Sequence, residues 1–223
     1  MGVSPMCFPA ILCATLCVLC VLRGSSLRNL NETMMLTKVR HKLADLQTAS
    51  DALGELCEPF VDDSDFSPYC VEVQPVRIPT AERRLLAHRE HMTEVLQTHH
   101  GQPVAVQVHD YKLEGDHYSR KITLTPGGLD KIVECGIVRL NFSFMPAVVK
   151  EEILARKTPL GAVLIRHNIL RWIEPLWFVQ LPPQSDVMKL FGINNPKPVW
   201  GRLAVIYCNG EPAIELLETV LNA

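Results

Sequence analysis

The middle of the chain carries a period-two pattern of apolar and polar residues that predicts β-strands. The pattern occurs in residues 103–111 and again in Tyr118–Leu124, and a more apolar segment follows at 132–142. The connections between these segments are short and contain the Gly and Pro residues typical of turns. Because strands joined by short turns pair antiparallel, we expect an antiparallel meander.

The end of the chain predicts a β-hairpin. Residues 202–208 form an apolar strand, and residues 211–220 form the strand that returns beside it. Between them lies Asn209-Gly210, the preferred two-residue hairpin turn, because both of its positions require a positive φ angle.

Other segments show the 3.6-residue period of amphipathic helices. The strongest of them ends at Gly101, where a glycine is well placed to terminate a helix. Thr158 and Pro159 are suited to the N-cap and the first position of another helix. The predicted helices cover residues 81–100, 146–156 and 160–170, with a short helix at 187–191 inside the loop 182–198 and an extended segment at 172–181.

One strand places a charge on its apolar face. Successive side chains of a strand point to opposite faces, so the even-numbered residues from Tyr118 to Leu124 share one face, which is apolar except for Arg120. The odd-numbered residues are polar, and we expect them to face water. An unpaired buried charge is very costly, so Arg120 requires a carboxylate from the protein or from an anionic ligand. A structural ion pair, or an arginine that reaches solvent at the sheet margin, is the alternative.

The last strand carries a second charge among apolar residues. Glu215 and Glu218 both lie within it, three positions apart. A carboxyl group that faced an apolar pocket could be neutral and could exchange a proton or a hydrogen bond with a ligand. Alternation requires at least one of the two glutamates to lie on the solvent face unless a bulge intervenes.

The N-terminal third of the chain differs from the rest. Residues 1–23 contain an apolar run, 5–22, that is a signal anchor, a cleaved signal peptide or translated sequence upstream of the true start. No basic residue precedes the run and arginines follow it, so we favour an anchor or a mis-assigned start, with a cytoplasmic domain that is membrane-tethered if the anchor is retained. Residues 24–79 form an extension that is first helical and then, over 57–82, an acidic, proline-bearing irregular connection. The main domain spans residues 80–223.

Composition and spacing exclude several classes of site. The chain has 223 residues, a net charge of −2 and no basic stripe, which argues against a nucleic-acid-binding protein. His88 and His91 are three residues apart, but no other ligand run accompanies them, so we expect no metal site. Cys57 and Cys70 bracket an acidic segment, and they would form a disulfide only in an oxidising compartment. Cys135 and Cys208 are expected to be small buried residues.

Taken together, the order of these elements resembles the chorismate pyruvate-lyase family over residues 80–223. The resemblance implies an α+β fold with a single antiparallel β-sheet flanked by helices, a fold shared with ligand-sensing domains of bacterial transcription regulators. The motifs that carry it are His91-Met92-Thr93, Tyr118-Ser119-Arg120, Lys157-Thr158-Pro159-Leu160-Gly161, Trp200-Gly201-Arg202 and Asn209-Gly210-Glu211-Pro212.

The family converts chorismate to 4-hydroxybenzoate and pyruvate without a metal or an organic cofactor. By resemblance, Arg120 would hold the ring carboxylate as the main catalytic residue. Met92, Leu160 and Gly161 would lie at the substrate pocket, with the Leu160 backbone amide available to the same carboxylate. The alternative is a non-catalytic module of the same fold that binds an aromatic acid.

A glutamate of the last strand would meet the oxygen that becomes the phenol of the product. A gapless match from Pro212 falls on Leu217, which lies between the two candidates. Glu218 is favoured by the residues that follow it, at the expense of one bulged residue, and Glu215 stays open as a catalytic candidate. In either case the expected partner is a small aromatic or enolpyruvyl acid.

Overall fold

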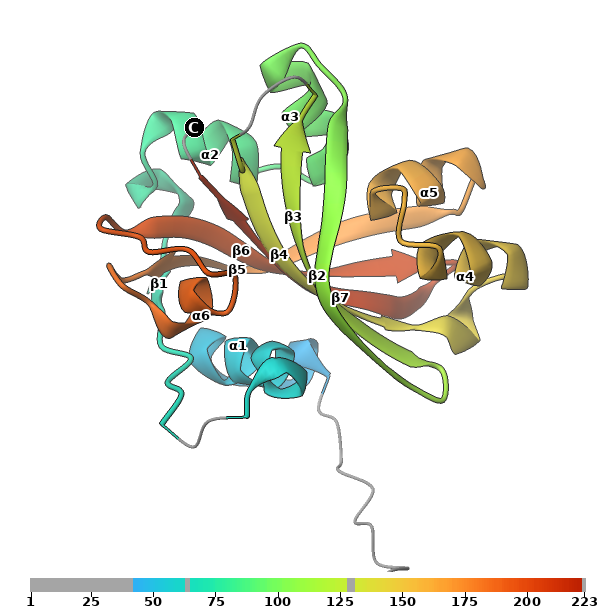
Figure 1. Cartoon of the computed structure of the whole chain (residues 1–223), viewed down its shortest axis with the longest axis horizontal. Coiled ribbons are helices and arrows are strands. Elements are labelled where there is room, and N and C mark those ends of the chain that lie inside the picture. The colour runs from blue at the N-terminus through green and yellow to red at the C-terminus, as the bar shows by residue number, and fades with distance from the viewer. Residues whose placement is uncertain (1–41, 63–64, 128–130, 222–223) are drawn as a thin grey trace, which may run out of the picture. The chain divides into compact units, whose positions relative to one another are not determined.

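The fold is built on one antiparallel β-sheet, which the computed structural model describes over residues 42–62, 65–127 and 131–221 (Figure 1). The sheet has seven strands in the described part of the chain, in the order β1-β5-β6-β7-β4-β3-β2. The strands are β1 (Val71–Val73), β2 (Val104–Glu114), β3 (His117–Pro126), β4 (Glu134–Asn141), β5 (Arg171–Leu181), β6 (Val199–Cys208) and β7 (Glu211–Val220).

Two three-stranded meanders make up most of this sheet. Strands β2, β3 and β4 form one and strands β5, β6 and β7 form the other, and the pairing of β4 with β7 joins them. The turn between β6 and β7 has φ angles of 54° at Asn209 and 91° at Gly210. The expected fold class is therefore confirmed: the protein is α+β, with a single antiparallel sheet flanked by helices.

Helices cover both faces of the sheet. The α-helices are α1 (Ala49–Cys57), α2 (Thr80–Leu86), α3 (Met92–His100), α4 (Ala147–Leu154), α5 (Leu160–Arg166) and α6 (Asp186–Lys189), and the 3₁₀ helices are η1 (Leu43–Asp45), η2 (Glu58–Phe60), η3 (Pro75–Arg77) and η4 (Phe142–Phe144). Figure 1 shows α1 and α6 below the sheet and α2 and α3 above it. Helices α2 to α5 share hydrophobic clusters with the face that carries Arg120, and α1, η2 and α6 share a cluster with the other face.

The expectation that the odd-numbered side chains of β3 face water was wrong. Ser119 and Thr123 are 2% and 1% exposed, and Lys121 donates a hydrogen bond to the Leu190 carbonyl at 3.0 Å. The cover comes from α1, η2 and the segment around α6, which lie far from β3 in the sequence. Alternation within one strand shows that two faces differ, but it does not show that the more polar face is left uncovered.

The predicted irregular connection 57–82 holds more regular structure than expected. It contains η2, η3 and β1, and β1 adds to the sheet edge by pairing with β5 through Val71–Gln180 and Val73–Phe178. Three residues are too few to display an alternating pattern, so the strand left no signal in the sequence.

The predicted helix 81–100 is two helices, α2 and α3, with a break at residues 87–91. Within the break, the guanidinium of Arg202 donates hydrogen bonds to the carbonyls of Leu86, His88 and Glu90. These carbonyls are therefore satisfied by a side chain rather than by the next turn of a continuous helix. The helix predicted from residue 160 is also shorter than expected, ending at Arg166 with Pro159 rather than Thr158 at its N-cap.

The cysteines of the described residues are buried thiols. Cys57 and Cys70 are both free, so the disulfide considered between them is not formed. Burial is the main cause that raises the pKa of the Cys57 thiol to about 12, and the nearby Cys70 adds to the shift. Cys135 and Cys208 are fully buried, as expected.

The apolar segment 1–23, the run 5–22 within it and the first part of the extension lie outside the described residues. Among the helices of residues 42–62, 65–127 and 131–221, none combines the length and the apolar composition needed to cross a bilayer.

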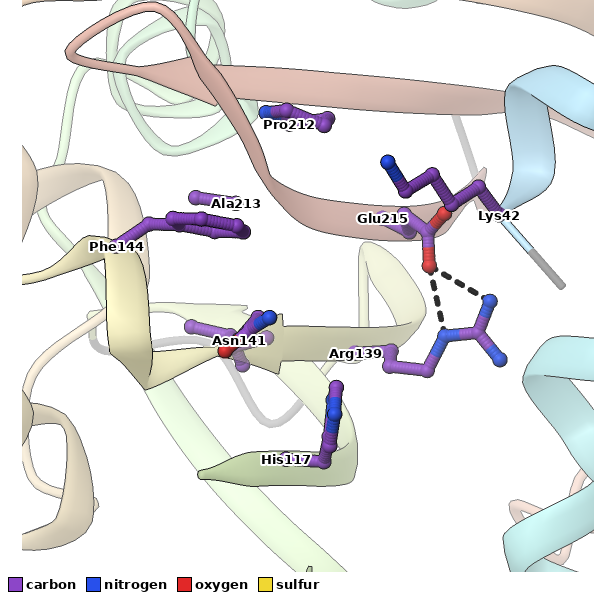
Figure 2. Close-up of a pocket in the computed structure, with 9 residues that line it drawn as sticks. Lys42, His117, Arg139, Asn141, Phe144, Pro212, Ala213 and Glu215 are labelled. Atoms are coloured by element: carbon purple, nitrogen blue, oxygen red, sulfur yellow. Dashed lines mark hydrogen bonds and ion pairs between the residues drawn. The ribbon is translucent and has the colours of Figure 1, made fainter. Parts of the chain in front are cut away.

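An ion pair fastens α1 and η1 to the sheet. Arg139 of β4 contacts the Glu215 carboxylate of β7 at 2.6 and 2.7 Å (Figure 2). Arg139 also contacts Glu55 of α1 at 3.4 Å. The second oxygen of Glu215 accepts the Leu43 N–H at 2.6 Å. The side chains of Arg139 and Glu215 are 7% and 12% exposed, so this pair is largely removed from solvent.

We predict that Arg139→Met lowers the free energy of unfolding by about 3–5 kcal/mol, because it leaves the Glu215 carboxylate without its cation. Urea denaturation followed by circular dichroism measures the change. The matched control is Arg166→Met, which breaks the exposed pair with Glu152 and should change stability by less than about 1 kcal/mol. Equal effects for the two substitutions would contradict a structural role for Arg139.

Candidate functional site: a cavity around two buried arginines

A small enclosed cavity lies above the centre of the sheet. Strands β3, β4, β6 and β7 form its floor, and the first residues of α3 and α5 form its walls. Its volume is about 40 Å³. Most of the lining is apolar, with Ile122, Leu124, Val138, Ile206 and Leu216 among the contributing side chains.

Arg120 lies in this cavity without a counter-ion. Its side chain is 0% exposed, and its Nε and Nη1 atoms have no hydrogen-bond partner in the described structure. The Tyr118 hydroxyl is buried beside this guanidinium and supplies a neutral oxygen but no negative charge. Burial lowers the pKa of Arg120, although a guanidinium remains charged at neutral pH. The cavity therefore contains an unsatisfied positive charge.

Two glutamates approach the same cavity from neighbouring strands. Glu134 of β4 is 2% exposed, and its Oε2 atom has no hydrogen-bond partner. Burial raises the pKa of Glu134 well above its ordinary value, and the charge of Glu218 raises it further, against a smaller lowering by Arg202. This shift favours the protonated form of the Glu134 carboxyl, in which it can donate a hydrogen bond.

Glu218 of β7 is held by the second buried arginine. Its Oε2 atom accepts a hydrogen bond from Arg202 Nε at 2.6 Å, and the Arg202 side chain is 0% exposed. The remaining donors of Arg202 bind the main chain between α2 and α3. The two arginines thus differ sharply, because Arg202 has a full set of acceptors and Arg120 does not.

A close approach of two helix starts forms the cavity wall. Met92 and Thr93 come from α3, and Leu160 and Gly161 come from α5. A β-carbon added to Gly161 would lie 2.9 Å from the β-carbon of His91 and 3.1 Å from the Thr93 hydroxyl. Glycine at this position therefore permits the contact that closes the wall.

His91 separates the cavity from the surface. It lines both the cavity and an outer pocket of about 290 Å³, to which Arg171 and Trp172 also contribute. Its Nε2 atom accepts a hydrogen bond from Arg171 Nε. Burial, followed by the charges of Arg171 and Arg202, lowers the pKa of His91 to about 4, so the ring is neutral at physiological pH.

Five of the six residues proposed from the sequence meet in this cavity: Met92, Arg120, Leu160, Gly161 and Glu218. The exception is Glu215, which faces the opposite side of the sheet and pairs with Arg139 (Figure 2). The two glutamates lie three positions apart, so they point to opposite faces. Glu215 therefore cannot act on a ligand held by Arg120.

The register of the last hairpin contains the extra residue that Glu218 requires. Ile206 pairs with Ile214, but the next residue, Tyr207, pairs with Pro212, so Ala213 has no partner on β6. Such a bulge shifts every later residue of β7 by one position relative to a gapless alignment.

Sequence reasoning missed Glu134, Arg202 and His91 as site residues. Glu134 is the first residue of β4, and a polar residue at that position is typical of the end of a turn. A signal was nevertheless present, because Glu134 and Val138 are four positions apart and so share a face, and Val138 pairs with Arg120. Arg202 is likewise a charge inside an apolar strand.

No group of three metal-ligating side chains occurs among the residues that the structure describes. The histidine pair noted in the sequence has other partners. His88 Nε2 lies 2.6 Å from the Leu85 carbonyl, and its Nδ1 accepts a hydrogen bond from the Glu90 N–H at 3.2 Å. His91 binds Arg171, so the two rings do not face a common ion.

We predict that Gly161→Ala disturbs the cavity wall and lowers the free energy of unfolding by about 1–3 kcal/mol, because the added methyl group would overlap His91. Thermal unfolding measures the change. Gly54→Ala is the control, since its added methyl group meets only Pro68 at 3.4 Å and helix α1 gains up to about 1 kcal/mol in propensity. A Gly161→Ala protein as stable as the control would contradict the prediction, because it would show that the cavity wall can shift to accommodate the methyl group.

Comparison with known proteins finds similarity only among solved structures. No protein-family model and no curated protein matches the chain. PhnF from Mycobacterium smegmatis is 15% identical, with a TM-score of 0.41 over 58% of this chain and 63% of that one, so the chain spans less than two thirds of its length. The effector domain of PhnF is 16% identical, with a TM-score of 0.41 over 59% of this chain and 87% of that one. The ligand-binding domain of a putative GntR-family transcriptional regulator from Bordetella bronchiseptica is 12% identical, with a TM-score of 0.39 over 53% of this chain and 86% of that one.

Proposed function

We propose that the cavity binds a small aromatic carboxylic acid and that the protein is a binding module for such a ligand. The observation that carries the proposal is the Arg120 guanidinium, which is fully buried and has unpaired donors. A ligand carboxylate would supply the missing negative charge and accept hydrogen bonds that are stronger than neutral ones.

The rest of the cavity suits a ring with a polar group at its far end. Leu124 and Val138 belong to the apolar lining, which favours an aromatic body. Glu134 lies four residues from Val138, the pairing partner of Arg120, which corresponds to about 13 Å of strand. Its protonated carboxyl can donate a hydrogen bond to an oxygen at the end of the ligand opposite the carboxylate.

Ligand entry requires the cavity to widen. Its volume of about 40 Å³ is close to the share of one water molecule in the liquid, about 30 Å³. An aromatic acid is several times larger, so the walls formed by α3 and α5 must move outward. The two walls meet where Gly161 of α5 lies against the side chains of His91 and Thr93 at the start of α3.

We predict that Arg120→Met weakens binding of 4-hydroxybenzoate to the full chain by about 100-fold or more, because the charged hydrogen bonds are lost. Isothermal titration calorimetry measures this affinity. The same substitution should leave the ligand-free protein equally stable or more stable by about 1–3 kcal/mol, since it removes an unsatisfied buried group.

Arg139→Met is the matched control, an arginine of the neighbouring strand on the opposite face of the sheet. It should lose stability and keep ligand binding in the protein that remains folded. If Arg120→Met were instead as destabilising as Arg139→Met and bound ligand normally, Arg120 would be a structural residue and the proposal would fail.

A second candidate function is the elimination of pyruvate from chorismate, and a specific observation favours it. The cavity is lined by a buried carboxyl group, Glu134, whose pKa is raised by burial, together with the unpaired guanidinium of Arg120. In this reaction the ether bond between the ring and the enolpyruvyl group breaks and the ring loses a proton, which makes it aromatic. The enolpyruvyl group gains a proton and leaves as pyruvate, and in this proposal Glu134 acts as the acid.

We predict that the full chain incubated with chorismate releases 4-hydroxybenzoate, detected by liquid chromatography. Glu134→Gln should keep ligand binding, because an amide still donates a hydrogen bond, but it should lower turnover by about 100-fold, the usual contribution of a general acid. A protein that binds 4-hydroxybenzoate but yields no product from chorismate would eliminate the lyase and leave the binding module.

A further inference from the structure

Arg202 connects two parts of the cavity that are otherwise separate. It is fully buried, and in addition to a 3.3 Å contact with His88 Nδ1 it has four oxygen acceptors within hydrogen-bond distance. One is the Glu218 carboxylate at 2.6 Å, on the cavity floor. The other three are the carbonyls of Leu86 at 3.0 Å, His88 at 2.8 Å and Glu90 at 3.2 Å, which belong to the connection between α2 and α3.

The charge of Arg202 determines the charge of the glutamate pair. Carbonyl groups carry no net charge, so a buried guanidinium still requires one ionised carboxylate, and Glu218 supplies it. A second buried carboxylate near Glu218 would add repulsion without a free cation at salt-bridge distance. The pair therefore holds one negative charge, which lies on Glu218, and Glu134 keeps its proton.

The carbonyl contacts of Arg202 also define the cavity wall. The connection that they fasten runs directly into His91, Met92 and Thr93, which line the cavity. The neighbouring position on β6 has no room for a side chain, because a β-carbon on Gly201 would lie 2.7 Å from the Glu218 carbonyl oxygen. One guanidinium thus sets both the position of the acid pair and the position of the wall.

We infer that Arg202 is a positioning residue for the cavity: it assigns the negative charge to Glu218 and the proton to Glu134, and it holds the start of α3 against the ligand. The inference rests on the proposed function only in treating the cavity as a ligand site. The charge assignment and the hold on the wall can both be measured on the ligand-free protein.

Other titratable groups lie near the pair of Glu134 and Glu218. Burial and the charge of Arg202 both lower the pKa of His88, so this ring adds no positive charge to the pair at neutral pH. The other titratable groups that line the same cavity are Arg120 from β3 and His91 from the connection. Cys135 follows Glu134 on β4 and lies on the opposite face of the sheet, and Glu90 lines the outer pocket.

The test follows each carboxyl group by ¹³C NMR of the full chain labelled at glutamate, with Glu134→Gln and Glu218→Gln used to assign the signals. In the wild type around pH 7 we expect an ionised Glu218 and a protonated Glu134. In Glu218→Gln, Arg202 keeps its charge and loses its counter-ion, so we expect Glu134 to become ionised. Two ionised glutamates in the wild type, or an unchanged Glu134 in Glu218→Gln, would overturn the inference.

A second measurement separates the charge of Arg202 from its geometry. Arg202→Lys keeps the positive charge, but an ammonium group cannot reach all four acceptors. We expect Glu218 to remain ionised while hydrogen exchange of the amides of residues 88–93 accelerates by about tenfold or more, since charged hydrogen bonds to the carbonyls are lost. Unchanged exchange would show that Arg202 does not hold the wall.

Arg166→Lys is the control for the exchange measurement, because this arginine is exposed and pairs with Glu152 away from the cavity. It should leave both readouts unchanged. A wild-type protein with the expected glutamate signals but no affinity for any aromatic acid would refute the proposed function and leave the role of Arg202 intact. The opposite combination would refute the role of Arg202 alone.

Discussion

An arginine buried without a counter-ion is the constraint on which this structure depends. Arg120 is fully buried on β3, whereas the equally buried Arg202 has a carboxylate and three carbonyls around it. An unpaired buried charge is costly, and an anionic ligand at Arg120 would offset that cost. The apolar walls and Glu134 lie around the same guanidinium, and we propose that together they form a binding site for an aromatic anion.

Local signals in the sequence were sufficient for most of the sheet but not for its surroundings. Alternation located β2 and β3, and Asn209-Gly210 located the last hairpin. The cover over Ser119 and Thr123 was not predictable from β3, because it is provided by residues of α1 and α6 that are distant in sequence. The break between α2 and α3 was hidden for the same reason, since it depends on hydrogen bonds from Arg202.

Some residues of the candidate site were likewise predictable from local sequence, and others depended on strand pairing. The inward direction of Arg120 followed from alternation, and the motifs shared with the lyase family pointed to Met92, Leu160, Gly161 and Glu218, which lie in one cavity. The choice between Glu215 and Glu218 needed the bulge at Ala213, which is a property of strand pairing. Glu134 was missed because a charged residue at the start of a strand is usually solvated, and only the register with β3 shows otherwise.

The ring of His91 stands between the cavity and the outer pocket beside Trp172, and this has a kinetic consequence. If exchange with bulk solvent passes this ring, it cannot be faster than the motion that displaces the ring and breaks its contact with Arg171. We then expect the observed association rate in stopped-flow experiments to level off as ligand concentration rises, as in gated binding. A strictly linear dependence on concentration would indicate another route. The His91 ring would then control the residence time of the ligand and not its affinity alone.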